Sequence, residues 1–226
     1  VLIPSNAAAG SYTNTTSTIS YDLAGSPTSS AASSNTISVY KAPSVSMSFI
    51  DDPVGLGQDV TLRYTVTNTD TTNALSSAVF QNTLDDQVPG LAVKTLPSAN
   101  SCGTGSTFAA SSDSNNSHYF RMSNGALAAG DNCSFDVILT LPTSGVPGNF
   151  TFTTGNISGT VSGASLTGNT ATDTLTVIGA PALTLSLSSG TVLPGDTVTA
   201  SFTLNYSSNA ASDAIGLGFS VDLDAA

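Results

Sequence analysis

The chain has 226 residues, 39% of them hydrophobic, so it is long enough to bury a core of its own. Only 8% of the residues are charged, none is Glu, and the formal net charge is −11. With four Lys and Arg residues in all, the chain has no basic surface for phosphate groups, which argues against binding to nucleic acid or to an anionic membrane. No apolar run reaches the roughly 18 residues that a membrane helix needs.

Ser, Thr, Asn, Gly and Ala fill much of the chain, whereas the strong helix formers Glu, Lys and Gln are nearly absent. Local preference therefore favours strands and turns. Small uncharged polar side chains of this kind are common in secreted bacterial surface proteins. We therefore expect an extracellular or cell-surface location.

Alternation of apolar and polar residues with a period of two predicts a series of short strands. The clearest example has Val60, Leu62, Tyr64 and Val66 on one face. Turn clusters separate the strands, and helical spacing finds little support. We predict an all-β fold of immunoglobulin-like sandwiches, with roughly seven to nine strands in each repeat. In chain order, the predicted strands cover residues 45–49, 60–67, 135–141, 150–161, 173–178 and 198–206.

The chain is also periodic. Residues 178–206 repeat the sequence pattern of residues 40–68 without a gap. The matches lie at a constant offset of 138, which extends to the N-terminus. The offset predicts three units. Residues 1–43 would be the C-terminal part of one immunoglobulin-like repeat, 44–181 a complete repeat, and 182–226 the N-terminal part of a following repeat.

Two Ala-Pro steps mark the expected boundaries between these units. Pro43 and Pro181 each follow a predicted strand, and proline holds the residue before it in extended geometry. Linkers this short leave little room for bending, so we expect tandem sandwiches to form a semi-rigid string. Gly57 and Gly195 occupy the same predicted turn in the two copies.

Cys102 and Cys133 are the only cysteines, and both lie in the complete repeat, 31 residues apart. They could be free buried thiols, half of a metal site or a disulfide. The extracellular composition favours a disulfide, and His118 is the only other soft ligand, which is too few for zinc. Closing a loop of this length would stabilise the fold by about 3–4 kcal/mol.

The order of motifs is similar to that of a known repeat. "PSVSMSF", "GLGQDVTLRYTVTNTD", "FQNTLDDQVPGL", "SCGTGSTF" and "GDNCSF" follow one another. This order resembles the tandem immunoglobulin-like conserved repeat domain of large bacterial surface and adhesin-type proteins, a family of uncharacterised function. Asn82 departs from the pattern, because the family usually has Asp there. The resemblance carries no catalytic residues.

The resemblance implies a structural role: a non-catalytic repeat of an extracellular fibre, stalk or adhesin-type surface protein. The alternative is a module that binds glycans or another cell surface through the region 100–132. We expect no enzyme, because no sequence signature surrounds any Ser that could act with His118.

Adjacent carboxylates are the candidate metal ligands. Asp51 with Asp52 and Asp85 with Asp86 lie beside turns, and hard oxygen ligands suit calcium. However, the sequence has no D-x-D-x-D-G loop, and solvated acids that keep an array soluble explain the pairs without a metal. We expect no other cofactor.

The two partial units need partners, because a third of a sandwich cannot bury its own apolar face. One account is that the sequence is a window on a longer repetitive chain, in which neighbouring repeats complete residues 1–43 and 182–226. The other is a head-to-tail exchange of strands between identical subunits. Both accounts predict a long, thin object outside the cell.

Overall fold

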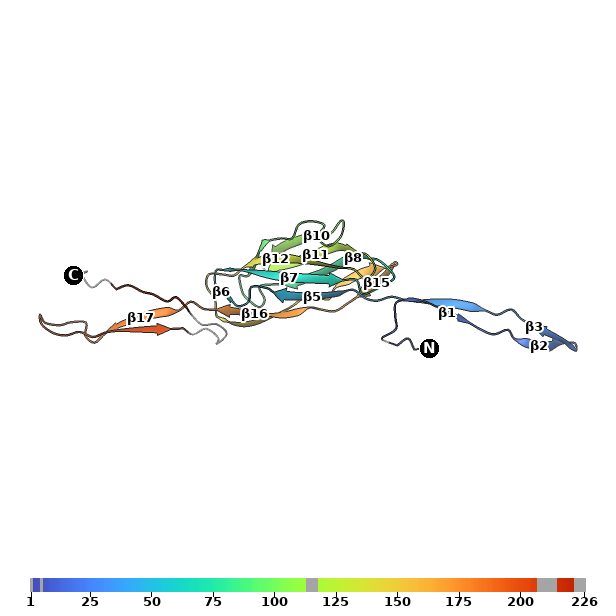
Figure 1. Ribbon diagram of the computed structural model, residues 1–226, viewed down its shortest axis with the longest axis horizontal. Helices are drawn as coiled ribbons and strands as arrows, with labels where there is room; N and C mark the ends of the chain where they lie inside the picture. Colours follow the sequence, from blue (N-terminus) through green and yellow to red (C-terminus); the bar gives the residue numbers. More distant parts are fainter. Residues whose placement is uncertain (1, 5, 113–117, 207–214, 222–226) are drawn as a thin grey trace.

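The computed structural model describes residues 2–4, 6–112, 118–206 and 215–221. Every regular element in these ranges is a β-strand. A central sandwich comprises residues 44–178, and two hairpin arms extend from its opposite ends (Figure 1). We call residues 2–40 the N arm and residues 182–221 the C arm, each within its described positions. No helix in the described ranges could cross a membrane.

One layer of the sandwich is a four-stranded sheet, which forms from the strongest alternating segments of the sequence. In β7, the even-numbered side chains are buried and the odd-numbered ones face outward. β12 pairs with β7 over nine residues and buries its own apolar face beside it. In spatial order the strands are β5 (Ser44–Phe49), β7 (Asp59–Thr67), β12 (Asn132–Thr140) and β9 (Ala92–Thr95).

The second layer is a five-stranded antiparallel sheet. Its central strand β8 pairs with β11 on one edge and with β14 on the other. Ser77, with φ of 53°, lies in β8 opposite the register shifts of β11, so the strand is bulged there. In spatial order the strands are β10 (Thr107–Ser112), β11 (His118–Leu127), β8 (Leu75–Thr83), β14 (Ser158–Val161) and β15 (Ala164–Thr167).

A third, three-stranded sheet closes the side of the sandwich. It contains β13 (Gly148–Thr153), β16 (Thr172–Ile178) and the two-residue strand β6 (Val54–Gly55), which runs parallel to β16. The single strand predicted over residues 150–161 is wrong. The chain leaves β13 at Thr153 and enters the five-stranded sheet with β14, so the two halves belong to different sheets.

The core lies between the layers and is built around aromatic rings. Tyr64 stacks on Phe120 with ring centroids 5.2 Å apart, and both side chains are fully buried. Phe80 and Phe135 approach the Tyr64 ring at 5.1 and 5.8 Å. The hydroxyl of Tyr64 accepts a 2.7 Å hydrogen bond from the buried side chain of Asn82, which supplies a polar partner inside the core.

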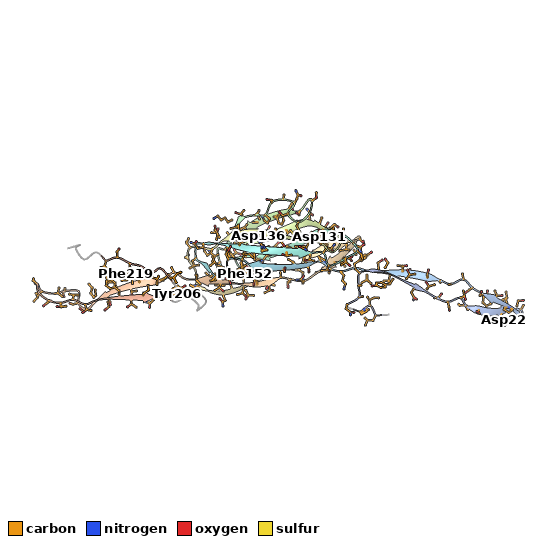
Figure 2. All side chains as sticks on the ribbon, viewed as in Figure 1. Asp22, Asp131, Asp136, Phe152, Tyr206 and Phe219 are labelled. Carbon is orange, nitrogen blue, oxygen red and sulfur yellow. A yellow bond between two sulfur atoms is a disulfide. The ribbon has the colours of Figure 1, made fainter. Side chains whose placement is uncertain are left out.

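The arms are two-stranded structures. In the N arm, β1 pairs with β4 and β2 pairs with β3. In the C arm, β17 pairs with β18. Asp22 lies near the tip of the N arm, and Tyr206 and Phe219 lie in the C arm (Figure 2). Their strands are β1 (Gly10–Thr15), β2 (Ser20–Leu23), β3 (Ser26–Ser29), β4 (Ser34–Val39), β17 (Ala182–Leu187) and β18 (Ala200–Asn205).

Candidate functional site: the two arms and the sandwich edge

The N arm has the same strand plan as the last part of the sandwich. Its four strands begin 138 positions before β13, β14, β15 and β16, in the same order. The register also agrees, because Gly10 faces Val39 in the arm as Gly148 faces Val177 in the sandwich. Even the threonine pair across the strands recurs, with hydroxyls 2.9 Å apart in the arm and 3.1 Å apart in the sandwich.

The C arm matches the first part of the sandwich in the same way. β17 pairs with β18 in the register that joins β5 to β7. Gly57 and Gly195 both have positive φ, 73° and 95°, in the turn that follows the first strand. The ring centroids of Phe202 and Phe219 lie 5.3 Å apart, close to the 5.1 Å between Tyr64 and Phe80, although Phe219 lies 139 positions after Phe80, one more than the offset of the strands.

The same positions differ in what covers them. Leu175 is fully buried in the sandwich, but its counterpart Ile37 is 50% exposed. Met47 is 8% exposed, whereas its counterpart Leu185 is 57% exposed. Each arm therefore presents an apolar face to solvent: Tyr12, Ile19, Leu23 and Ile37 in the N arm, and Leu183, Leu185, Leu187, Phe202 and Leu204 in the C arm.

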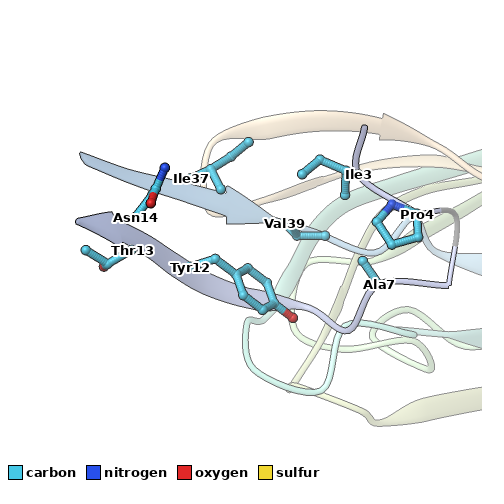
Figure 3. A pocket seen from close by; sticks show the side chains of 8 residues that line it. All are labelled: Ile3, Pro4, Ala7, Tyr12, Thr13, Asn14, Ile37 and Val39. Carbon is cyan, nitrogen blue, oxygen red and sulfur yellow. The ribbon is translucent and has the colours of Figure 1, made fainter. Parts of the chain in front are cut away.

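The N arm also has an apolar hollow of about 470 Å³ (Figure 3). Ile3, Pro4, Ala7 and Tyr12 line it together with Ile37 and Val39 of β4 and two polar residues of β1, Thr13 and Asn14. The matching wall of the sandwich is formed by Pro142, Gly145 and Phe150. There the side chain of Leu56, from the turn after β6, lies against the wall, and a smaller hollow of about 320 Å³ remains. The hollow of the N arm is thus the place where the sandwich accommodates a side chain from its own first third.

The joint between the N arm and the sandwich is held by a buried acid. The carboxylate of Asp70 accepts the backbone N–H of Lys41 at 3.1 Å, and it also accepts bonds from Thr72 and Asn73. Burial alone would raise the pKa of Asp70, but the hydrogen bonds from Thr72, Lys41 and Asn73 lower it to about 2. Asp70 is therefore an anion that fixes the residue two positions before Pro43.

The first and last strands of the sandwich lie side by side along one edge. Among the described residues, direct backbone pairing along this edge is confined to β6, the short continuation of β5, where Val54 and Gly55 face Val177 and Ile178 of β16 in parallel. Along the residues before β6, hydrogen bonds from side chains to backbone groups take the place of bonds between the two backbones. Each contact joins residues 124 positions apart: Asn169 with Val45, Asp173 with Phe49, and Asp52 with Thr176.

These three contacts form what we call the side-chain ladder. The amide of Asn169 holds both backbone groups of Val45, accepting from its N–H at 3.0 Å and donating to its carbonyl at 2.7 Å. Asp173 accepts the N–H of Phe49 at 2.7 Å. Asp52 accepts the N–H of Thr176 at 2.6 Å. Backbone donors at the edge of each sheet are thus satisfied by the opposite strand.

The structure joins Cys102 and Cys133 in a disulfide, with their Cα atoms 5.2 Å apart. Both cysteines belong to the buried core, so the bond ties the loop before β10 to the start of β12. The region 100–132 between them contains β10 and β11. Residues 113–117 of that region lie outside the described residues, and its proposed binding role stays a prediction.

The acidic pairs do not form an evident metal centre. Asp51 accepts the backbone N–H of Thr61 at 3.2 Å, and Asp52 is part of the side-chain ladder. Asp85 and Asp86 follow β8. In the part of the chain that the structure describes, no group of three or more acidic, His or Cys side chains is placed to hold a metal ion. The calcium hypothesis gains no support from this geometry and stays a prediction.

Sequence reasoning missed Asp70, Asn169 and Asp173. Asp70 ends "TNTD" and is followed by "TTN" in a turn, which is a common position for an acid that accepts bonds from backbone donors. Asn169 and Asp173 carry no local signal, because their partners are 124 residues away. The spacing of four between them matches the spacing of Val45 and Phe49, but that signal is visible only when the two segments are known to be parallel.

Comparison with protein families identifies the sandwich. A family model described as a domain of unknown function, DUF7933, matches residues 43–177. The chain belongs to the DUF7933 family. The match begins at the joint residue Pro43 and ends one residue before the end of the sandwich at Ile178. No curated protein matches the sequence.

Solved structures share the β-sandwich of this DUF7933 chain at low identity. A cohesin module from a family 33 glycoside hydrolase of Clostridium perfringens is 7% identical with a TM-score of 0.41, covering 60% of this chain and 98% of the module. BcpA, the major pilin subunit of Bacillus cereus, is 10% identical with a TM-score of 0.41, covering 62% and 41%. A non-cellulosomal cohesin from Archaeoglobus fulgidus is 17% identical with a TM-score of 0.39, covering 59% and 91%. At these values no partner or activity is transferred to this chain.

Proposed function

We propose that this DUF7933 chain is a non-catalytic structural segment of an extracellular fibre, stalk or adhesin-type surface protein, built from tandem sandwiches. The observation that carries the proposal is the equivalence of the two arms to the last and first parts of the sandwich. The sequence resemblance to bacterial surface repeats and the acidic, lysine-poor composition support it.

The arms also indicate the kind of partner. Inside the sandwich, the last part packs against the first part, with Phe152 and Phe49 ring centroids 5.2 Å apart. The N arm resembles the last part and the C arm resembles the first. The partner of each arm is therefore a matching part of another repeat, contributed by the same chain or by an identical subunit head-to-tail.

Covering the apolar faces provides the driving force. Fully burying a large aliphatic or aromatic side chain contributes about 1.5–3 kcal/mol, so five such side chains contribute on the order of 10 kcal/mol before the costs of association. The hollow of the N arm is a site that side chains from a C arm would fill in this contact. The residues equivalent to Leu56 and its turn are Pro194 and the residues beside it in the C arm.

Location is the first test of the proposal. An antibody raised against residues 44–181 should label the outside of intact source cells, along thin appendages seen by electron microscopy. Label confined to the cell interior would contradict the proposal. Lysed cells serve as the control for antibody access.

Association of the 226-residue chain tests the head-to-tail partner. Ile37→Asp places a charge on the N arm face and Leu185→Asp places one on the C arm face. We expect each variant alone to stay monomeric in sedimentation experiments at concentrations where the parent chain forms oligomers. A mixture of the two should form dimers only, because one intact N arm and one intact C arm remain. Val146→Asp, at a 79% exposed sandwich position, is the control and should associate like the parent chain.

A further inference from the structure

We propose that the side-chain ladder is a shear clamp that gives each sandwich resistance to pulling along the fibre. The inference rests on the proposed function, because only a chain held at both ends experiences such a pull. It concerns residues 45, 49 and 52 on one strand path and residues 169, 173 and 176 on the other.

The path of the chain decides how a pull is applied. The chain enters the sandwich through β5 and leaves it through β16, and the two arms extend from opposite ends (Figure 1). β6 continues the path of β5 and pairs in parallel with β16. Tension on the two ends of the chain therefore slides these strand paths past each other, parallel to their length.

The placement of the contacts makes the sliding costly. The three contacts lie at residues 45, 49 and 52, and the parallel backbone pair at 54 and 55 continues the row. Bonds that lie across the direction of pulling are loaded together, whereas bonds that open one after another fail singly. No strand can shift by one residue unless all three side-chain contacts break at once.

The packing beneath the ladder keeps the two paths in register. Phe49 and Phe152 meet edge to face in the core directly behind the contacts. A Cβ at Gly168 would lie 1.8 Å from the carbonyl oxygen of Pro43, so the backbone before the last strand is already in close contact with the joint. Sliding would therefore also disrupt packing at the point where the chain enters.

The arms carry only part of this device. The counterpart of Asn169 is Ala31, the counterpart of Asp52 is Gly190, and the counterpart of Asp173 is Asn35. Two of the three side chains that make the ladder are thus missing from a contact between an N arm and a C arm. We expect such a contact between two copies to separate under tension before the sandwich opens.

Single-molecule pulling on the 226-residue chain, tethered at its two ends, tests the clamp. Asn169→Ala, Asp52→Ala and Asp173→Ala should each increase the unfolding rate of the sandwich at constant force by roughly tenfold, because each removes a side-chain hydrogen-bond contact from the loaded row. Asp173→Asn keeps an oxygen acceptor and should restore most of the resistance. The unfolding of the sandwich is recognised by comparing traces with and without a reductant. Reduction opens the disulfide loop of 31 residues, so the extension gained when the sandwich unfolds increases by about 100 Å.

Asp136→Ala is the matched control. It removes a surface contact of similar type, the Arg63–Asp136 pair at 2.8 Å between β7 and β12, which does not lie between the loaded strands. Its unfolding rate under force should stay within about twofold of the parent chain. If the ladder variants lose stability to urea but unfold under force at the parent rate, the clamp is refuted. If the ladder variants unfold faster under force but the antibody labels only the cell interior, the proposed fibre function is refuted and the shear clamp is retained.

Discussion

The carboxylate of Asp70 accepts the backbone N–H of Lys41 at 3.1 Å, at the point where the N arm joins the sandwich. The same carboxylate organises the turn through Thr72 and Asn73. One buried charge therefore fixes both the turn and the direction in which the chain enters. Because these hydrogen bonds favour the charged carboxylate, protonation of Asp70 in acid should weaken them.

The stability that Asp70 provides should depend on pH. Its pKa is lowered to about 2 in the folded chain from an ordinary value of 3.8, so its contribution is complete above about pH 5 and is lost as the pH falls toward 2. The contribution is about 2 kcal/mol. Asp70→Asn should be less stable than the parent chain in urea unfolding at pH 7, and the gap should close as the pH falls to 2. A gap that is constant over that range would contradict the assignment.

Loss of the disulfide should destabilise the sandwich. Replacing Cys102 and Cys133 by Ala should lower the free energy of unfolding by about 3–4 kcal/mol, because the unfolded chain regains the freedom of the closed loop. Thermal unfolding with and without a reductant provides the measurement. The parent chain should lose stability when reduced, whereas the double variant should be insensitive to the reductant.

Tyr64 and Asn82 should show strong coupling. Tyr64→Phe leaves the buried amide of Asn82 with the sulfur of Met47 at 3.7 Å as its remaining acceptor, which should cost about 1–3 kcal/mol. Adding Asn82→Leu should recover part of that loss, because neither polar group is then buried. Urea unfolding of the two single variants and the double variant gives the coupling energy.

Arg63→Ala is the control for the buried Tyr64–Asn82 pair, because it removes a polar contact at the surface. The Arg63–Asp136 ion pair is half exposed, with 50% and 39% of the two side chains accessible, so its loss should cost less than about 1 kcal/mol. Equal losses at the core pair and the surface pair would show that burial of the amide is not the cause.

Gly168 should not tolerate a side chain. Gly168→Ala would push a methyl group against the Pro43 carbonyl oxygen, so we expect a loss of about 2 kcal/mol or more and a displaced joint. At Gly55 the nearest atom to an added Cβ is a flexible Gln58 carbon at 3.5 Å, so Gly55→Ala is the control. Thermal unfolding compares the two variants, and equal melting temperatures would contradict the expected clash.

The sequence predicted the all-β class and the strongest strands well, because alternating apolar and polar residues in those strands indicate one buried face. Alternation around Tyr64 is local, and it corresponds to the buried pattern of β7. Short edge strands were harder to predict. The two residues of β6 and the four of β14 carry too little pattern, so the described part of residues 44–178 contains twelve strands where roughly seven to nine were expected. The ladder could not be predicted, since it depends on polar side chains that meet backbone groups 124 positions away only after folding.

The positions of the four basic residues have a consequence for cleavage by proteases. Arg63, Lys94 and Arg121 lie in strands β7, β9 and β11, and the first two pair with Asp136 and Asp59. Proteases need several residues of extended, accessible chain, which a paired strand provides only when it opens locally. Lys41 is half-buried at the joint, and Asp70 holds its backbone N–H, so it too lies outside any extended, accessible segment. A trypsin-like enzyme should therefore cut the native chain slowly and leave the sandwich whole. Proteases specific for Glu have no cleavage site in this sequence, folded or unfolded.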